Sequence, residues 1–241
     1  MTNYYKIARL TVAMDTFGRT KDQAEPYQTE ECDKPDIIIS SNWREFQQKN
    51  PHLSEEDSEY LITGADFYRK LLTFDGMLLH SSAVVKDGKA YLFTAACGTG
   101  KSTHTSLWLQ VFEDAYILND DKPALRLEDG KFYAYGTPWS GKYDISKNIQ
   151  VPLAGICVLH RGAENKIETY QGKNALHDIL EQTMRPNNPQ LVGKLLELLD
   201  KLLLQVPVWR LKCNMEPEAA LVSYGAMSGA GKYVENNTYF S

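Results

Sequence analysis

The residues best suited to chemistry stand in one short segment, residues 95–102, which reads Ala-Ala-Cys-Gly-Thr-Gly-Lys-Ser. It matches the phosphate-loop pattern GxxxxGK[ST] except that Ala95 occupies the position of the first glycine. Glycines let consecutive backbone N–H groups turn toward phosphate oxygens, and a following helix presents its positive N-terminus to the same anion. In this pattern Lys101 would reach the β- and γ-phosphates, the Ser102 hydroxyl would bind Mg²⁺, and Thr103 would add a phosphate contact.

The stretches on either side of this segment agree with a phosphate loop. An apolar run over residues 91–93 precedes it as a strand should, and a helical run from Ser102 to about Phe112 follows it. Cys97 is either a reactive thiol within the loop or a small residue tolerated there. The residues predicted to bind nucleotide are Cys97, Gly98, Thr99, Gly100, Lys101, Ser102 and Thr103.

Two adjacent carboxylates, Asp120 and Asp121, follow the next apolar strand of the sequence, residues 115–118. A phosphate loop needs an acid at the end of a neighbouring strand to hold its metal ion, and a second carboxylate there can accept the proton of an attacking hydroxyl. We therefore assign Mg²⁺ to Ser102 and Asp120, and proton transfer to Asp121. Without the loop upstream, the same residues would indicate a solvated Asn-Asp-Asp turn.

Three further polar side chains are candidates for the same site. His80 ends the apolar stretch before the first predicted hairpin, where an imidazole could assist proton transfer or orient a carboxylate, although a lone histidine at a strand end is more often structural. Lys142 follows Trp139 in a loop, and Arg161 follows a strand predicted over 153–159. These two cations either neutralise the charge of the transferred group or lie solvated on the surface.

Composition and charge narrow the class of protein. The chain has 241 residues, of which 43% are hydrophobic and 24% charged, as is ordinary for a globular protein. Lys and Arg total 26 against 31 Asp and Glu, a net charge of −5, which argues against a dedicated DNA- or RNA-binding protein. The four cysteines form no CxxC pair and no zinc pattern with histidine, so reduced thiols are expected. Neither a signal peptide nor an apolar stretch of about 20 residues is visible, which predicts a cytoplasmic protein without membrane segments.

The sequence patterns divide the chain into three parts. Residues 1–75 are predicted to form a short α/β lead-in packed on the core, residues 76–227 a core that contains the loop, and residues 228–241 a polar, mobile tail. The elements predicted in the lead-in are strands over 7–14 and 36–40 and a helix that begins near Ser54.

The core departs from the alternating strands and helices of common phosphate-loop enzymes. An Asp87-Gly88 turn joins the strand before the loop to its predecessor, and an Asp129-Gly130 turn marks a second hairpin. The predicted fold class is therefore α/β (α+β), with a mixed, largely antiparallel sheet around the phosphate loop (P-loop) and helices toward the C-terminus. The elements predicted in the core are strands over 77–85, 90–94, 115–118, 125–127, 131–135, 153–159 and 206–212, two helices over 173–205 and a short helix capped by Asn214.

At these residues the chain resembles the HPr kinase/phosphorylase family and, more distantly, the phosphoenolpyruvate carboxykinases. Members place a hairpin before the loop, with a histidine on its first strand, and an Asp-Asp pair after the loop helix. The matching residues here are His80, the loop residues 98–103, and Asp120 with Asp121. The resemblance covers roughly residues 76–165.

This resemblance implies a fold of the HPr kinase and carboxykinase type. It implies that Lys101, Ser102 and Asp120 hold an Mg-nucleotide. It also implies that His80 and Asp121 work beside the acceptor hydroxyl. The predicted catalytic residues are therefore Asp121, His80 and Lys101.

The predicted function is ATP-dependent transfer of a γ-phosphoryl group to a hydroxyl, such as that of a serine, on a protein, peptide or small molecule. Two alternatives stay open, a nucleotide-binding regulator without turnover and a carboxykinase-like metabolic enzyme. The expected cofactors are ATP and Mg²⁺, with ADP or pyrophosphate as alternative donors. The identity of the acceptor and a homo-oligomeric state stay open, and neither nucleic acid nor a membrane is expected as a partner.

Overall fold

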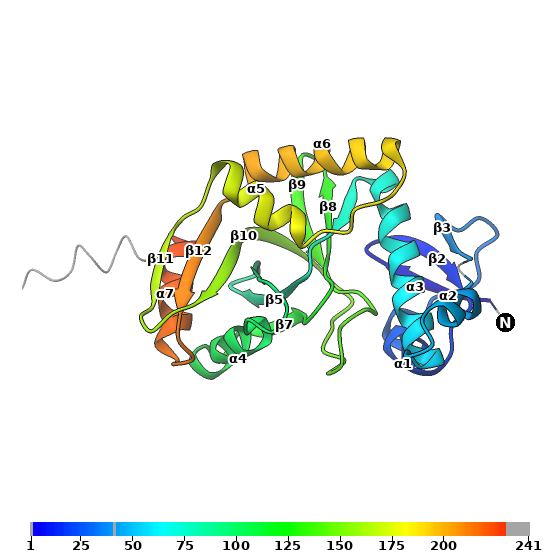
Figure 1. The fold of residues 1–241 in the computed structure, drawn as a ribbon, viewed down its shortest axis with the longest axis horizontal. Helices are drawn as coiled ribbons and strands as arrows, with labels where there is room; N and C mark the ends of the chain where they lie inside the picture. Colours follow the sequence, from blue (N-terminus) through cyan, green and yellow to red (C-terminus); the bar gives the residue numbers. More distant parts are fainter. Residues whose placement is uncertain (1, 41, 230–241) are drawn as a thin grey trace, which may run out of the picture.

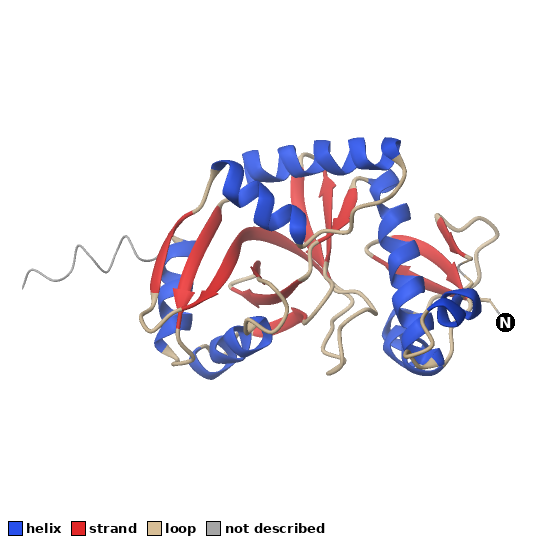
Figure 2. Cartoon of the chain, in the orientation of Figure 1, coloured by secondary structure: helices blue, strands red, loops and turns tan. Residues whose placement is uncertain are grey.

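The computed structural model describes residues 2–40 and 42–229. In this part of the chain two β-sheets and seven α-helices form a mixed α/β structure, with a small N-terminal unit beside a larger core (Figure 1). We call the described residues up to 75 the N-terminal unit. Helices cover both faces of the larger sheet (Figure 2).

The N-terminal unit has its own three-stranded sheet. Its elements are β1 (Asn3–Ile7), β2 (Leu10–Met14), α1 (Gly18–Ala24), a 3-10 turn (Glu25–Tyr27), β3 (Ile37–Ile39), α2 (Trp43–Lys49), α3 (Glu55–Leu71) and a second 3-10 turn (Leu72–Phe74). β1 and β2 pair antiparallel, and β3 pairs parallel with β2. The single strand predicted over 7–14 is wrong, because the chain turns at Ala8 and Arg9, whose φ angles are 49° and 66°. Neither residue is a glycine, so the usual sequence signal of a two-residue hairpin is missing.

α3 begins where the sequence predicts it and connects the unit to the core. The Ser54 hydroxyl caps the helix by accepting a hydrogen bond from the Asp57 N–H at 3.0 Å. Farther along, Phe67 and Leu71 enter a hydrophobic cluster that contains residues of the N-terminal sheet and also Trp139 of the core. The N-terminal unit and the core therefore share buried side chains.

Glu59 of α3 is a buried acid in this unit. It is fully buried, and the Thr20 hydroxyl of α1 donates a hydrogen bond to its carboxyl group. Burial, together with the negative charges of Asp15 and Glu56, raises the pKa of Glu59 to about 7. The folded state therefore keeps a proton that the unfolded chain releases near the ordinary pKa of a glutamate. The free energy of unfolding should fall as the pH rises from about 5 to about 7.

We expect the ionisation of Glu59 to remove on the order of 2–3 kcal/mol of stability over that range. Urea unfolding of the wild type and of Glu59→Gln at a series of pH values measures this effect, because glutamine keeps the size of the side chain and does not titrate. The stability of the wild type relative to Glu59→Gln should decline with rising pH. A difference that stays constant across the range would show that Glu59 is already ionised in the fold.

The larger sheet has nine strands in the described residues, with both parallel and antiparallel pairs. Its strands are β4 (Gly76–Leu78), β5 (Ser81–Lys86), β6 (Lys89–Thr94), β7 (Tyr116–Asn119), β8 (Ala124–Glu128), β9 (Lys131–Tyr135), β10 (Gln150–Arg161), β11 (Lys166–Thr169) and β12 (Val208–Cys213). The order β4-β8-β9-β10-β6-β5-β7 runs along the sheet, and β12 joins β10 to β11. β10 pairs parallel with β6 and β12, and the other pairs of this sheet are antiparallel. The predicted mixed, largely antiparallel sheet is confirmed.

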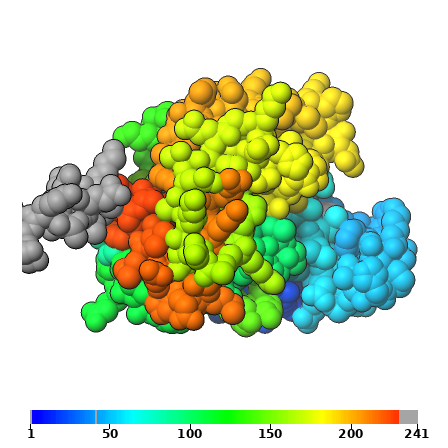
Figure 3. Space-filling view, turned by 60° about the vertical axis from the view of Figure 1, so that its left-hand side comes forward, coloured from blue at the N-terminus to red at the C-terminus, as the bar shows by residue number. Residues whose placement is uncertain are grey.

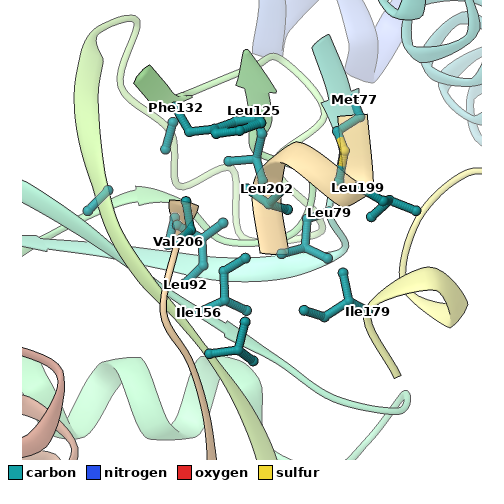
Figure 4. Packing of buried hydrophobic residues seen from close by; sticks show 14 of the residues in the cluster. Met77, Leu79, Leu92, Leu125, Phe132, Ile156, Ile179, Leu199, Leu202 and Val206 are labelled. Carbon is teal, nitrogen blue, oxygen red and sulfur yellow. The ribbon is translucent and has the colours of Figure 1, made fainter. Parts of the chain in front are cut away.

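The two faces of this sheet bury different side chains, because successive residues of a strand point to opposite faces. The covering helices are α4 (Lys101–Val111), α5 (Gly172–Glu181), α6 (Pro189–Gln205) and α7 (Glu218–Ser228). In β6, Ala90 and Leu92 belong to the cluster under α5 and α6, whereas Tyr91 and Phe93 belong to the cluster with α4 and α7. Figure 4 shows the first cluster, in which Leu202 of α6 lies among side chains of the sheet. In the space-filling view of Figure 3, α6 runs along the top of the molecule.

Two element predictions in the core are wrong. The stretch 77–85 is two strands, β4 and β5, which pair with different partners, and His80 lies in the break between them. The last helix begins at Glu218 rather than at a cap by Asn214. The Asn214 side chain instead accepts a hydrogen bond from the Glu216 N–H at 3.0 Å, in the turn before the helix.

The end of the described chain follows α7. Ser228 is the last residue of this helix, and Gly229 follows it in the left-handed conformation. The rest of the predicted tail, residues 230–241, lies outside the described residues. None of the helices in the described part of the chain combines the length and the apolarity needed to cross a membrane.

Candidate functional site

Residues 95–102, which we call the glycine loop, run from the end of β6 into the first turn of α4. Two of these residues adopt backbone conformations that favour glycine, with φ of +74° at Gly98 and +121° at Gly100. α4 begins at Lys101, and its N-cap residue brings no side chain to the first N–H groups of the helix. These N–H groups and the positive end of the helix are therefore available to an anion.

Two cations lie on the glycine loop. The Lys101 ammonium donates a hydrogen bond to the Ala95 carbonyl at 3.1 Å. Burial lowers the pKa of Lys101, and the nearby Asp121 carboxylate acts in the opposite direction. Arg161, the last residue of β10, donates to the Gly98 carbonyl at 2.6 Å. Lys101 belongs to the loop segment itself, whereas the fold brings Arg161 to the loop across 63 positions of the sequence.

Asp120 is surrounded by hydroxyl groups. β7 ends at Asn119, so that Asp120 and Asp121 both follow the strand and their carboxylates turn to different partners. The Ser82 hydroxyl donates to Asp120 Oδ1 at 2.6 Å, and the Ser102 hydroxyl lies near enough to the same carboxylate to lower its pKa. Burial raises the pKa of Asp120, and the two hydroxyls partly offset this effect. The two residues that the sequence assigns to a metal ion therefore lie beside each other.

Asp121 is held by two basic side chains. His80 Nε2 lies 3.1 Å from Asp121 Oδ1, and the Lys122 ammonium pairs with Oδ2. Burial would raise the pKa of Asp121, but the hydrogen bonds and charges of His80 and Lys122 outweigh it and lower the pKa to about 2. His80 Nδ1 lies 3.2 Å from Gln182 Oε1 at the end of α5. The carboxylate is thus ionised and oriented, and 22% of its side chain is exposed.

The loop between β9 and β10, residues 136–149, returns across the end of β7. The Asp120 N–H donates to the Ile145 carbonyl of this loop at 3.1 Å. Gly141 of the same loop lies directly against Asp121, since a Cβ added at Gly141 would come within 3.1 Å of Asp121 Cβ. The loop therefore forms one wall of the site around the two acids.

Sequence reasoning missed several members of this site. Lys142, which the sequence offered as a candidate, is exposed, and its ammonium lies over the ring of Tyr143. The lysine that pairs with Asp121 is Lys122, which was not predicted. The position of Lys122 directly after the two acids was an available signal. Ser82 follows His80 by two residues but had no recognisable pattern. Gln182 had no local signal, because only the packing of α5 brings it to the site.

Two cavities flank the glycine loop, and Thr99 and Arg161 line both of them. One, of about 460 Å³, lies between the loop, α4 and the residues that follow β12. The other, of about 410 Å³, lies between the loop and α5, and its wall includes Gln182, the partner of His80. The second cavity thus borders the residue that His80 contacts, and the first extends from the loop toward α4.

The donor atoms near Asp120 fit Mg²⁺. Among residues 2–40 and 42–229, no group of three or more His, Cys, Asp or Glu side chains is placed to hold a metal ion. Mg²⁺, however, is commonly bound by one or two protein oxygen donors, with water and substrate phosphates completing its shell. The Ser102 hydroxyl and the Asp120 carboxylate supply such oxygens, and a cation there would offset the cost of burying the carboxylate charge.

Comparison of the sequence with models of protein families gives no match, and comparison with curated protein sequences gives none either. Among solved structures, the chain is similar to the HPr(Ser) kinase/phosphatase from Coxiella burnetii, with 12% sequence identity and a TM-score of 0.38. That alignment covers 65% of this chain and 97% of the other chain. The likeness concerns the fold and is distant, so function has to be inferred from the site.

Proposed function

We propose that the chain is an Mg-ATP-dependent phosphotransferase that moves the γ-phosphoryl group of ATP to a hydroxyl of a protein, peptide or small molecule. The observation that carries this proposal is the meeting of two arrangements at one point. One is the glycine loop with Lys101 and Ser102, and the other is the ionised Asp121 held by His80. Asp120 joins them, because it lies beside Ser102 and precedes Asp121 in the chain.

In the proposed reaction the acceptor oxygen forms a bond to the γ-phosphorus, the bond from that phosphorus to the bridging oxygen of ADP breaks, and the acceptor proton moves to Asp121. The loop N–H groups and Lys101 bind phosphate oxygens, while Arg161 fixes the loop through the Gly98 carbonyl. His80 orients the carboxylate from 3.1 Å. A carboxylate with a pKa of about 2 is a weak base, but phosphoryl transfer depends mainly on positioning and charge neutralisation.

Ser102 and Asp120 are the residues that would hold Mg²⁺. When bound, the ion supplies charge neutralisation at the β- and γ-phosphate oxygens. A nucleotide-binding regulator without turnover would need the glycine loop but no second carboxylate held by a histidine. The contact between His80 and Asp121 therefore favours an enzyme over a regulator.

Transfer of label from ATP radiolabelled at the γ-phosphate to a cell extract tests the proposal. With Mg²⁺ the wild type should label an acceptor, and the product should withstand acid, as the phosphate ester of an alcohol does. Asp121→Asn in the same extract controls for other kinases and should add no label. Equal labelling by the two proteins, or an acid-labile product, would contradict transfer to a hydroxyl by this site.

Asp120→Asn and Asp121→Asn should fail in different ways. Asp120→Asn should remove the Mg²⁺ dependence of ATP binding, because Asp120 lies beside Ser102 at the predicted metal position. Asp121→Asn should bind MgATP normally and turn it over about 10²-fold or more slowly, the usual scale of general base catalysis. Titrations of ATP affinity at increasing Mg²⁺ concentration, together with steady-state rates of MgATP turnover, separate the two effects. If both variants show the same metal defect and the same rate, the division of roles is wrong.

A further inference from the structure

Side chains of the N-terminal unit hold the backbone of Gly141 on both sides. The Gln23 amide on α1 donates to the Gly141 carbonyl at 2.9 Å, and the Gly141 N–H donates to the Tyr60 hydroxyl on α3 at 3.0 Å. Gln23 and Tyr60 lie 118 and 81 positions from Gly141 in the sequence. Both are buried, with 5% and 4% of their surface exposed, so these hydrogen bonds are partly shielded from water.

Gly141, whose backbone these hydrogen bonds fix, packs against Asp121. Its φ of +78° favours glycine, and a Cβ at this position would lie 3.1 Å from Asp121 Cβ and 3.8 Å from Oδ2. The backbone of the loop thus packs directly on the carboxylate that the proposed reaction uses. A shift of Gly141 would either crowd that carboxylate or open a gap beside it.

Tyr60 reaches the same carboxylate by a second route. The Lys122 ammonium lies 5.1 Å from the centroid of the Tyr60 ring, and this ammonium pairs with Asp121 Oδ2. The Arg19 guanidinium lies over the same ring at 4.0 Å, which fixes the ring from α1. The hydroxyl of Tyr60 therefore acts on Gly141 and its ring acts on Lys122, the two neighbours of Asp121 Oδ2.

We propose that Tyr60 and Gln23 are positioning residues, which fix the Asp121 carboxylate through the loop and the lysine beside it. The N-terminal unit then takes part in phosphoryl transfer although it touches neither the glycine loop nor the predicted metal ligands among the contacts described above. This proposal rests on the proposed function for the role of Asp121 as proton acceptor. The hold on the loop itself is independent of that role.

Tyr60→Phe and Gln23→Leu each remove one hydrogen bond to Gly141 and nearly keep the size of the side chain. Each should speed hydrogen exchange of the amides in residues 136–148 about five- to tenfold. Each should also lower the rate of MgATP hydrolysis, with water as acceptor, about tenfold at unchanged MgATP affinity. Tyr5→Phe is the matched control, because Tyr5 is equally buried and its hydroxyl bonds within the N-terminal unit at 3.0 Å.

Faster exchange together with slower turnover at unchanged affinity supports the proposal. If amide hydrogen exchange of the loop in both variants equals that in Tyr5→Phe, the proposal is overturned. Faster hydrogen exchange with MgATP hydrolysis at the rate of Tyr5→Phe overturns it as well. If the wild type neither binds nor hydrolyses MgATP, the proposed function fails. In that case the exchange data still decide whether the N-terminal unit holds the loop at Asp121.

Discussion

Lys101→Ala should abolish MgATP-dependent turnover and weaken nucleotide binding about tenfold or more. The Lys101 ammonium lies on the glycine loop, 3.1 Å from the Ala95 carbonyl, and it is the cation that the loop sequence itself provides. Its partial burial makes its interaction with a phosphate stronger than that of a solvated surface lysine. Binding of a fluorescent ATP analogue and release of ADP measure the two effects.

The matched control for this prediction is Lys49→Ala. Lys49 is an exposed cation on α2 that pairs with Glu45 at 2.7 Å, and its loss should change neither affinity nor turnover. Circular dichroism on each variant shows whether the fold is kept. A folded Lys101→Ala protein with the affinity and rate of Lys49→Ala would remove the basis for a phosphate site at the glycine loop.

His80→Ala should lower the turnover rate about 10²-fold or more and leave the affinity for MgATP nearly unchanged. The imidazole lies 3.1 Å from Asp121 and 3.2 Å from Gln182, so its loss removes one of the two basic side chains that orient the carboxylate. Steady-state kinetics and a thermal melt on the same sample separate a catalytic effect from a structural one.

A second histidine of the chain serves as the control for His80. His177 lies 3.4 Å from Asp178, with 73% of its side chain exposed, and His177→Ala should leave turnover at the level of the wild type. If His80→Ala melts at a lower temperature but turns over normally, His80 is a packing residue of the break between β4 and β5. Asp121 would then act as the proton acceptor without it.

Local patterns were enough to predict the elements around the glycine loop. The hairpin before it depends on Asp87 and Gly88, whose φ angles of 51° and 68° satisfy a two-residue turn. The strand after α4 ends at Asn119, which leaves both acids beyond the sheet as their proposed roles require. Such features are encoded by neighbouring residues, so a single sequence reveals them.

The contacts that complete the candidate site are encoded over long distances. His80 meets Gln182 across 102 positions, and Gly141 meets Gln23 across 118. No periodicity or motif marks such residues, because each contact exists only after α1, α3 and α5 have packed. The break at His80 was missed for a related reason: the pairing partners of β4 and β5, not the residues of the stretch itself, decide where one strand ends.

Titration calorimetry of the wild-type protein tests most directly whether the glycine loop and Asp120 together bind Mg-ATP. ATP is titrated once with Mg²⁺ present and once with excess chelator. We predict one ATP bound per chain, with higher affinity when Mg²⁺ is present, and loss of that Mg²⁺ dependence in Asp120→Asn. Absence of ATP binding by the folded wild type in both titrations would contradict the claim.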